Sequence, residues 1–172
     1  MRQRLPALGG APISRLLVIG LMLLLAGCAS PPDRPTQLRQ ALLGLSEQAT
    51  RLLIEEPAWE LEAREVVLLL SSTEVEASLP IGQARFEESL TRALLAYPAG
   101  PQVIDWQPRI SHAEAPAGQW LLDTRLVADG PELRLSDRTL LPYRLELRLR
   151  RPEDTRPRWE RTISGAFDAD AL

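Results

Sequence analysis

Residues 65–72 read EVVLLLSS, a continuous apolar run that ends in two serines. The run is too short for a good helix, and the β-branched residues at its start favour a strand. Because apolar residues occupy both of its alternating faces, we expect a strand that is buried on both sides, as in a parallel sheet. The fold then depends on the elements that flank this strand.

An amphipathic helix is predicted on each side of it. The first spans residues 37–54, with Thr36 as its N-cap, Pro57 just beyond it, and an apolar stripe made by Leu38, Leu42, Leu45, Ala49 and Leu52. A long connection over residues 72–82 leads to the second helix, between Gly82 and Pro98, with Phe86, Leu90, Ala93, Leu94 and Tyr97 on one face. The run QVIDW at 102–106 predicts a second strand. Strand, helix and strand form a βαβ unit, so these two strands should be parallel.

The remaining chain predicts antiparallel strands. QWLLDTRLV at 119–127 is a third strand, and Leu133 and Leu135 begin a further strand or a bulged edge. In YRLELRLR at 143–150, apolar and charged side chains alternate at every position, which is typical of a strand with one buried face. A charged turn at 151–158 leads to a last strand at 159–167. We therefore expect an α+β fold: a mixed β-sheet, made of one βαβ unit followed by an antiparallel meander, with two helices packed on it in two or three layers.

The first 27 residues have the three zones of a secretory signal. Arginines at positions 2, 4 and 15 precede the apolar run LLVIGLMLLLA at 16–26, and Gly27 follows it. A permanent transmembrane helix is the alternative, but a span needs about 20 apolar residues. We expect residues 1–27 to be removed, which leaves 28–36 as a proline-rich tether and 37–172 as a single domain.

The sequence LAGC at 25–28 resembles the lipobox of bacterial lipoproteins, and Cys28 is the chain's one cysteine. The resemblance implies cleavage before Cys28, a lipid on its sulfur and acylation of its new amino group. Several acyl chains hold a protein stably on a membrane, whereas one does not. Because Ala29 rather than aspartate follows the cysteine, lipoprotein sorting by analogy implies the outer membrane, at its periplasmic face.

Charge and cysteine content exclude several classes of function. Residues 1–27 hold three of the 20 arginines and no acidic residue, so the mature chain has 17 arginines against 23 acidic side chains, a net charge of −6. No basic stripe suits nucleic acid. No lysine is available for catalysis, and a single cysteine cannot form a disulfide within the chain.

We expect no enzyme, no metal and no cofactor. His112 is the one histidine and has no cysteine or second histidine to complete a metal site. The nucleophile elbow and the glycine-rich nucleotide loops are absent. An acidic cluster comprises Glu55, Glu56, Glu60, Glu62 and Glu65, and such a run is typical of a solvated face.

A binding surface is the better hypothesis. Arg144, Arg148 and Arg150 share one face of the predicted strand, with Arg125 and Arg161 on strands that could lie nearby, and such a row can clamp carboxylates or phosphates. The alternative is a solvated sheet face balanced by Glu146 and Glu160. Trp106, Trp120 and Trp159 lie within strand patterns, which favours core packing over recognition.

Across residues 37–167 the order of elements resembles the small periplasmic lipoproteins of the FlgO and LpoB type, which share a fold with the N-terminal domain of TolB. The segments that carry the resemblance are VVLLLSS, the PIG opening of the second helix, QWLLDTRLV and YRLELRLR. The resemblance implies a protein that acts by binding: one member activates a peptidoglycan synthase and another supports the flagellum. An activator anchored in the outer membrane needs a long flexible arm to reach a synthase in the inner membrane. The tether of this chain is too short for that.

We therefore expect a non-catalytic, lipid-anchored periplasmic protein that binds another cell-envelope component. Its partners are the membrane, through the lipid on Cys28, and another envelope protein. Three alternatives stay open: a carrier of a lipid or glycan, which needs a cavity between helices and sheet, an activator of a peptidoglycan synthase, and a hydrolase with an unfamiliar site.

Overall fold

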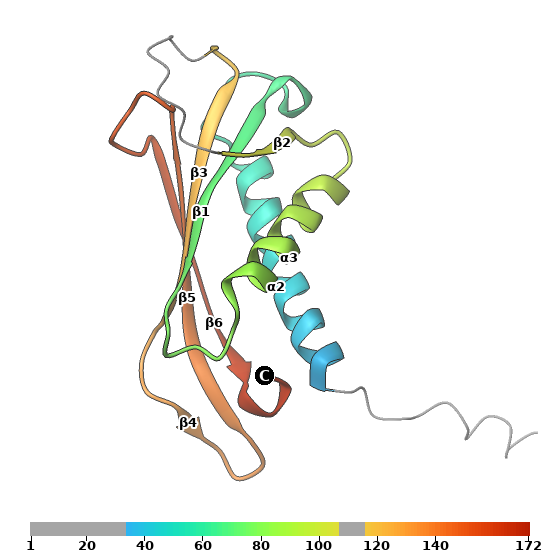
Figure 1. Ribbon diagram of the computed structural model, residues 1–172, viewed down its shortest axis with the longest axis vertical. Coiled ribbons are helices and arrows are strands. Elements are labelled where there is room, and N and C mark those ends of the chain that lie inside the picture. Colours follow the sequence, from blue (N-terminus) through green and yellow to red (C-terminus); the bar gives the residue numbers. More distant parts are fainter. Residues whose placement is uncertain (1–33, 107–115) are drawn as a thin grey trace, which may run out of the picture. The chain divides into compact units, whose positions relative to one another are not determined.

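The buried strand predicted from residues 65–72 lies inside a six-stranded mixed sheet. The computed structural model describes residues 34–106 and 116–172 (Figure 1). Its helices are α2 (Arg34–Glu55) and α3 (Gln83–Ala96), with short 3₁₀ turns η2 (Ala63–Glu65) and η3 (Ala169–Ala171). Its strands are β1 (Val67–Val75), β2 (Gln102–Asp105), β3 (Gln119–Ala128), β4 (Leu133–Arg134), β5 (Thr139–Arg150) and β6 (Trp159–Asp168).

The pairing of the strands confirms the predicted fold class. β1 pairs parallel with β2 on one side and with β3 on the other. β5 pairs antiparallel with β3, β4 and β6. Both helices pack on the same face of the sheet, so the described part of the chain has two layers (Figure 1).

The apolar stripes of the helices and the apolar faces of the strands form one core. Phe86, Leu90 and Leu94 of α3 are buried as predicted. On α2 the stripe ends at Leu53, and Leu52 is only partly buried. β5 alternates as expected: Tyr143, Leu145, Leu147 and Leu149 face the helices and are buried.

Three predicted boundaries are wrong. α2 begins at Arg34, so Thr36 lies inside its first turn and cannot be its N-cap. β1 begins two residues late, after the 3₁₀ turn, because η2 ends at Glu65. β5 begins at Thr139 and contains Pro142, whose carbonyl accepts from the Asp129 N–H at 3.0 Å. A residue with an N–H at this position would direct it toward β3, whose hydrogen-bonded pairing with β5 ends at Ala128 and Tyr143. The proline therefore costs β5 no hydrogen bond within this pairing.

The connection predicted for residues 72–82 is shorter than expected, because β1 continues to Val75. One extra residue of β1 lies between Leu70, which pairs with Leu122, and Thr73, which pairs with Thr124. This bulge keeps the side chains of Thr73 and Val75 on the helix side, where Thr124 Oγ1 donates to Thr73 Oγ1 at 3.0 Å. A pattern with period two is broken by the extra residue, so the sequence did not show the continuation.

Glu76 ties the end of β1 to the end of β3. Its carboxylate accepts from Ser78 Oγ at 2.6 Å and from the Ala128 N–H at 3.1 Å. The Ser78 hydrogen bond, then that of Ala128, lowers the pKa of Glu76 below its ordinary value of 4.5. A hydrogen bond to the charged form always acts in this direction.

A pH dependence follows for Glu76→Gln. Because the pKa is lower in the folded state, the carboxylate stabilises the fold fully above pH 4.5, and this contribution is lost as pH falls through the folded pKa. The urea midpoint of the variant should therefore lie below that of the wild type at pH 7, and the two should converge in acid. Glu47→Gln, an exposed α2 position, is the control. A Glu76→Gln difference that stays constant from pH 7 to pH 3 would contradict the assignment.

Candidate functional site

Two of the chemically distinctive residues lie outside the part of the chain that the structure describes. They are Cys28, the predicted lipid attachment, and His112. Both predictions therefore stay predictions. None of the helices within residues 34–106 and 116–172 is long and apolar enough to cross a membrane. Within the same residues, no group of three or more histidine, aspartate and glutamate side chains is placed to hold a metal ion.

The structure places Arg144, Arg148 and Arg150 on one face of β5, the face turned away from the helices. This arrangement follows from the period of two, since the residues between them face the core. Neighbouring strands add Arg125 from β3 and Glu160 from β6, because each pairs in register with the outward positions of β5. We call this surface the outer sheet face.

Every arginine of the predicted row has a carboxylate partner on the outer sheet face. Arg150 Nε lies 2.8 Å from Asp123 Oδ2, which is the shortest of these ion pairs. The other pairs are Arg144 with Asp129 at 3.3 Å and Glu146 at 3.5 Å, Arg148 with Glu146 at 3.1 Å and Glu160 at 3.5 Å, and Arg125 with Glu74 at 3.3 Å. The row is therefore part of a ladder in which positive and negative side chains are paired. An anionic ligand could bind these arginines only by displacing their carboxylate partners.

Arg161 does not join this ladder. It follows Glu160 directly in β6, so its side chain lies on the other face of the sheet. Its guanidinium donates two hydrogen bonds to Glu56 Oε2, at 3.1 and 3.0 Å, just after the end of α2. The acidic cluster from Glu55 to Glu65 is exposed, as predicted for a solvated face. Arg161 and Glu56 thus fasten the edge of the sheet to a helix end.

Two of the three candidate tryptophans belong to the core. Trp120 and Trp159 are buried, whereas Trp106 is half-buried just after β2. The ring centroid of Trp120 lies 6.2 Å from that of Trp59, and the Arg151 guanidinium lies 4.3 Å from the centroid of Trp120. These contacts assign Trp120 to packing, as the strand pattern favoured.

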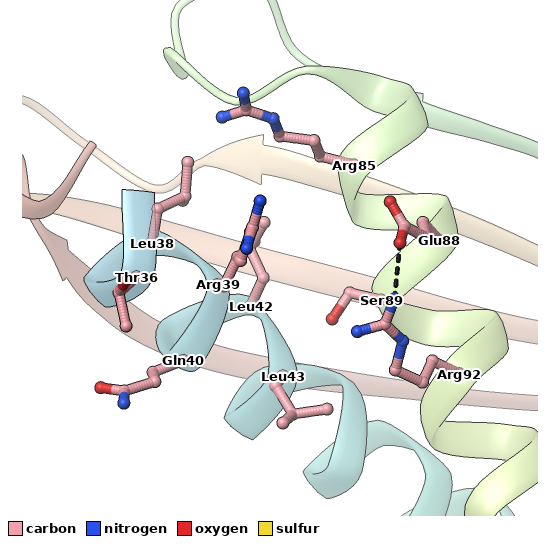
Figure 2. Close-up of a pocket in the computed structure, with 10 residues that line it drawn as sticks. All are labelled: Thr36, Leu38, Arg39, Gln40, Leu42, Leu43, Arg85, Glu88, Ser89 and Arg92. Atoms are coloured by element: carbon pink, nitrogen blue, oxygen red, sulfur yellow. Dashed lines mark hydrogen bonds and ion pairs between the residues drawn. The ribbon is translucent and has the colours of Figure 1, made fainter. Parts of the chain in front are cut away.

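A groove between α2 and α3 is the feature that the sequence did not reveal. The helices touch where the buried Ser46 donates its hydroxyl to Ser89 Oγ at 3.1 Å. Small side chains at Ala49 and Ala93 are also buried here, which suits a close crossing of two helices. Toward their N-terminal ends the helices separate, and a groove opens between them (Figure 2).

This α2–α3 groove encloses about 370 Å³, which is within the range of small-molecule sites. Its lining residues are Thr36, Leu38, Arg39, Gln40, Leu42 and Leu43 from α2, and Arg85, Glu88, Ser89 and Arg92 from α3. Figure 2 shows the side chains of Arg39, Arg85 and Arg92 extending over the space between the helices. Glu88 is the one carboxylate in the lining, and it pairs with Arg92 at 2.6 Å. The lining therefore carries three positive charges against one negative charge.

The sequence contained only part of this signal. Arg85 and Arg92 are seven residues apart, so they lie on one face of a helix. Arg39 lies off the apolar stripe of α2. Nothing in the sequence predicts that these two polar faces meet, because the crossing of α2 and α3 is set by the packing of both helices on the sheet.

Comparison with known proteins gives little further information. No known protein family matches the chain, and no curated protein matches it. One solved structure to which the chain is similar is that of protein XCC0632 from Xanthomonas campestris, of the family DUF330. The identity is 14%, the TM-score is 0.40, and the match covers 65% of this chain and 71% of that chain. This similarity is too low to assign a family.

Proposed function

We propose that the protein is a non-catalytic, lipid-anchored periplasmic protein that binds another envelope component close to the outer membrane. The lipid is attached to Cys28, within the lipobox-like sequence at 25–28. The resemblance of the element order to the FlgO and LpoB type supports an action by binding. The partner is another envelope protein.

The observation that carries this proposal is the start of α2 at Arg34. Only five residues then separate Cys28 from the folded domain, and a chain of this length spans at most about 20 Å. The domain is thereby restricted to the membrane surface. A partner must lie at the same membrane or extend to it, which argues against the long-armed activation of an inner-membrane synthase.

The outer sheet face is the surface that we propose for the partner. Its charges alternate in fixed register, and Arg148 lies between Glu146 and Glu160. Alternating charge gives specificity by complementarity and penalises partners with a different pattern. A hollow of about 290 Å³ lies on this face, lined by residues of the ladder such as Arg148 and by Thr155 and Pro157 of the turn after β5, and it adds shape to the charge pattern.

The carrier alternative needs a cavity between the helices and the sheet. In the described residues that space holds buried side chains of both layers, among them Phe86 from α3 and Leu145 and Leu147 from β5. A core packed in this way leaves no room for an acyl chain without rearrangement. The envelope-protein partner is therefore the better supported proposal.

The test is a crosslinking pull-down of the lipidated protein from its native envelope. We expect one specific envelope protein with the wild type, its loss with Cys28→Ala, and at least a tenfold reduction with Arg148→Glu. A glutamate at position 148 would lie between Glu146 and Glu160, so three carboxylates would lie together and a partner that complements Arg148 would be repelled. Arg134→Glu, which reverses an exposed charge on β4, is the matched control. Recovery of lipid or glycan alone would support the carrier instead.

A further inference from the structure

We infer that the α2–α3 groove binds a phosphate group, held between arginines of the two helices. The inference goes beyond the proposed function, because it concerns a different surface and a different ligand. It also stands without the lipid anchor, since the residues that carry it are all on α2 and α3. A phospholipid headgroup and a soluble phosphate ester share this chemistry.

The arginines of the groove differ from those of the outer sheet face in their ion pairs. On the outer sheet face each arginine has a carboxylate within 3.5 Å. Among the residues that the structure describes, neither Arg39 nor Arg85 has a carboxylate within 4.0 Å. These two guanidinium groups lie over one groove, in a chain with more acidic than basic residues. A local excess of positive charge attracts anions against the charge of the whole protein.

The positions of the two arginines favour phosphate over carboxylate. A carboxylate has two oxygens and one charge, which a single guanidinium fork can satisfy. Arg39 and Arg85 come from different helices, so an occupant that contacts both needs acceptors on more than one side. Phosphate offers oxygens in three dimensions and carries up to two negative charges. Three arginines and one glutamate leave a charge of +2, which such a group balances.

Ser89 supplies a donor at the inner wall of the groove. Its oxygen accepts the hydrogen bond from Ser46, so its own hydroxyl hydrogen stays available. Ser89 lines the groove and is partly buried, whereas Ser46 is fully buried below it. Leu43, which is 36% exposed, adds an apolar wall beside these polar groups. The groove therefore suits a phosphate whose remaining substituent is at least partly apolar.

The test measures thermal unfolding of the full chain in micelles of an uncharged maltoside detergent. Inorganic phosphate is titrated in one arm, and phosphatidic acid or phosphatidylcholine is mixed into the micelles in the others. A ligand that binds only the folded state raises the Tm. We expect a rise with phosphatidic acid that phosphatidylcholine does not produce. A rise with inorganic phosphate at similar concentration would assign a soluble phosphate ester, and no rise with it would assign the lipid headgroup.

The variant Arg39→Gln/Arg85→Gln should bind at least about tenfold more weakly, because hydrogen bonds to charged groups are the strong ones. Both side chains are exposed, so the fold should tolerate the change. Arg51→Gln/Arg156→Gln removes the same charge outside the groove and should bind like the wild type. Ser89→Ala is a second, milder variant with an expected loss of about two- to fivefold.

The inference is overturned if the Tm does not respond to phosphatidic acid or phosphate, or if both double variants lose the response equally. The second outcome would mean that net charge alone attracts the ligand. Failure here would leave the proposed function intact, because the pull-down depends on Arg148 and Cys28 and on neither helix. Failure of the pull-down would likewise leave the groove unaffected.

Discussion

Replacing Phe86 by alanine should lower the free energy of unfolding by about 3–5 kcal/mol, the usual cost of truncating a buried phenylalanine. Phe86 is 0% exposed and is the largest of the fully buried side chains. It inserts from the first turns of α3 into the cluster formed by the helices and the sheet. Neighbours on a rigid sheet can close only part of the resulting cavity, so the transfer and cavity costs add.

The matched control for this prediction is Leu95→Ala on the same helix. Leu95 is 64% exposed, so the same kind of truncation should change stability by less than about 0.5 kcal/mol. Chemical denaturation of both variants measures the difference directly. Equal effects at the two positions would mean that α3 does not pack on the sheet as described. The α2–α3 groove would then lose one of its walls as well.

Gly165→Ala should destabilise the protein by about 1–3 kcal/mol, the typical cost of overpacking. Gly165 pairs with Tyr143 across β5 and β6, and the phenol ring of Tyr143 lies directly over it. A Cβ at position 165 would lie 2.5 Å from the Tyr143 hydroxyl oxygen and 2.7 Å from the adjoining ring carbon. The ring cannot easily swing aside, because it stacks on Phe167 with centroids 4.2 Å apart. Glycine is required here by close approach of an aromatic ring.

Two further variants separate this clash from an effect on the strand. In a Tyr143→Leu background, Gly165→Ala should cost less than about 0.5 kcal/mol, because the ring is gone. Gly44→Ala makes the same substitution on α2, where an added Cβ meets nothing within 4 Å. It should stabilise the protein by about 0.5–1 kcal/mol through helix propensity. A full cost of Gly165→Ala in the leucine background would exclude the ring as the cause.

The two charged surfaces of the domain differ in a way that matters for function. On the outer sheet face, strands in fixed register place each arginine beside a carboxylate, as Arg150 is beside Asp123. In the α2–α3 groove, Arg39 and Arg85 extend from separate helices into open space. The first arrangement favours recognition of another patterned surface, and the second favours capture of a small anion. The two proposals can therefore be tested with variants that share no residue.

Periodicity determined most of the fold from the sequence. The alternation from Tyr143 to Arg150 fixes which side chains face the core, because successive side chains of a strand point to opposite faces. The apolar stripes of α2 and α3 fix their buried faces in the same way. The order of strand, helix and strand was sufficient to predict that β1 and β2 are parallel. The sequence also placed Arg144, Arg148 and Arg150 together.

Local departures from these periods were not predictable. The extra residue between Leu70 and Thr73 changes which positions of β1 face the helices, from even-numbered to odd-numbered residues. The last residues of the strand therefore do not continue the alternation, and the sequence predicted a loop there. Pro142 looked like the limit of β5, because the sequence does not show that the neighbouring strand ends beside it. Each departure depends on the position of a partner strand distant in sequence.

What the sequence by itself determined is therefore the type, the order and the buried face of each element, since these depend on spacing along one chain. Only the tertiary structure decided which polar faces meet. The carboxylate partners of Arg148 and Arg150 lie partly on other strands, and the groove of Arg39 and Arg85 lies between two helices. Such contacts depend on the packing of whole elements against the sheet, and one-dimensional periodicity contains no information about it.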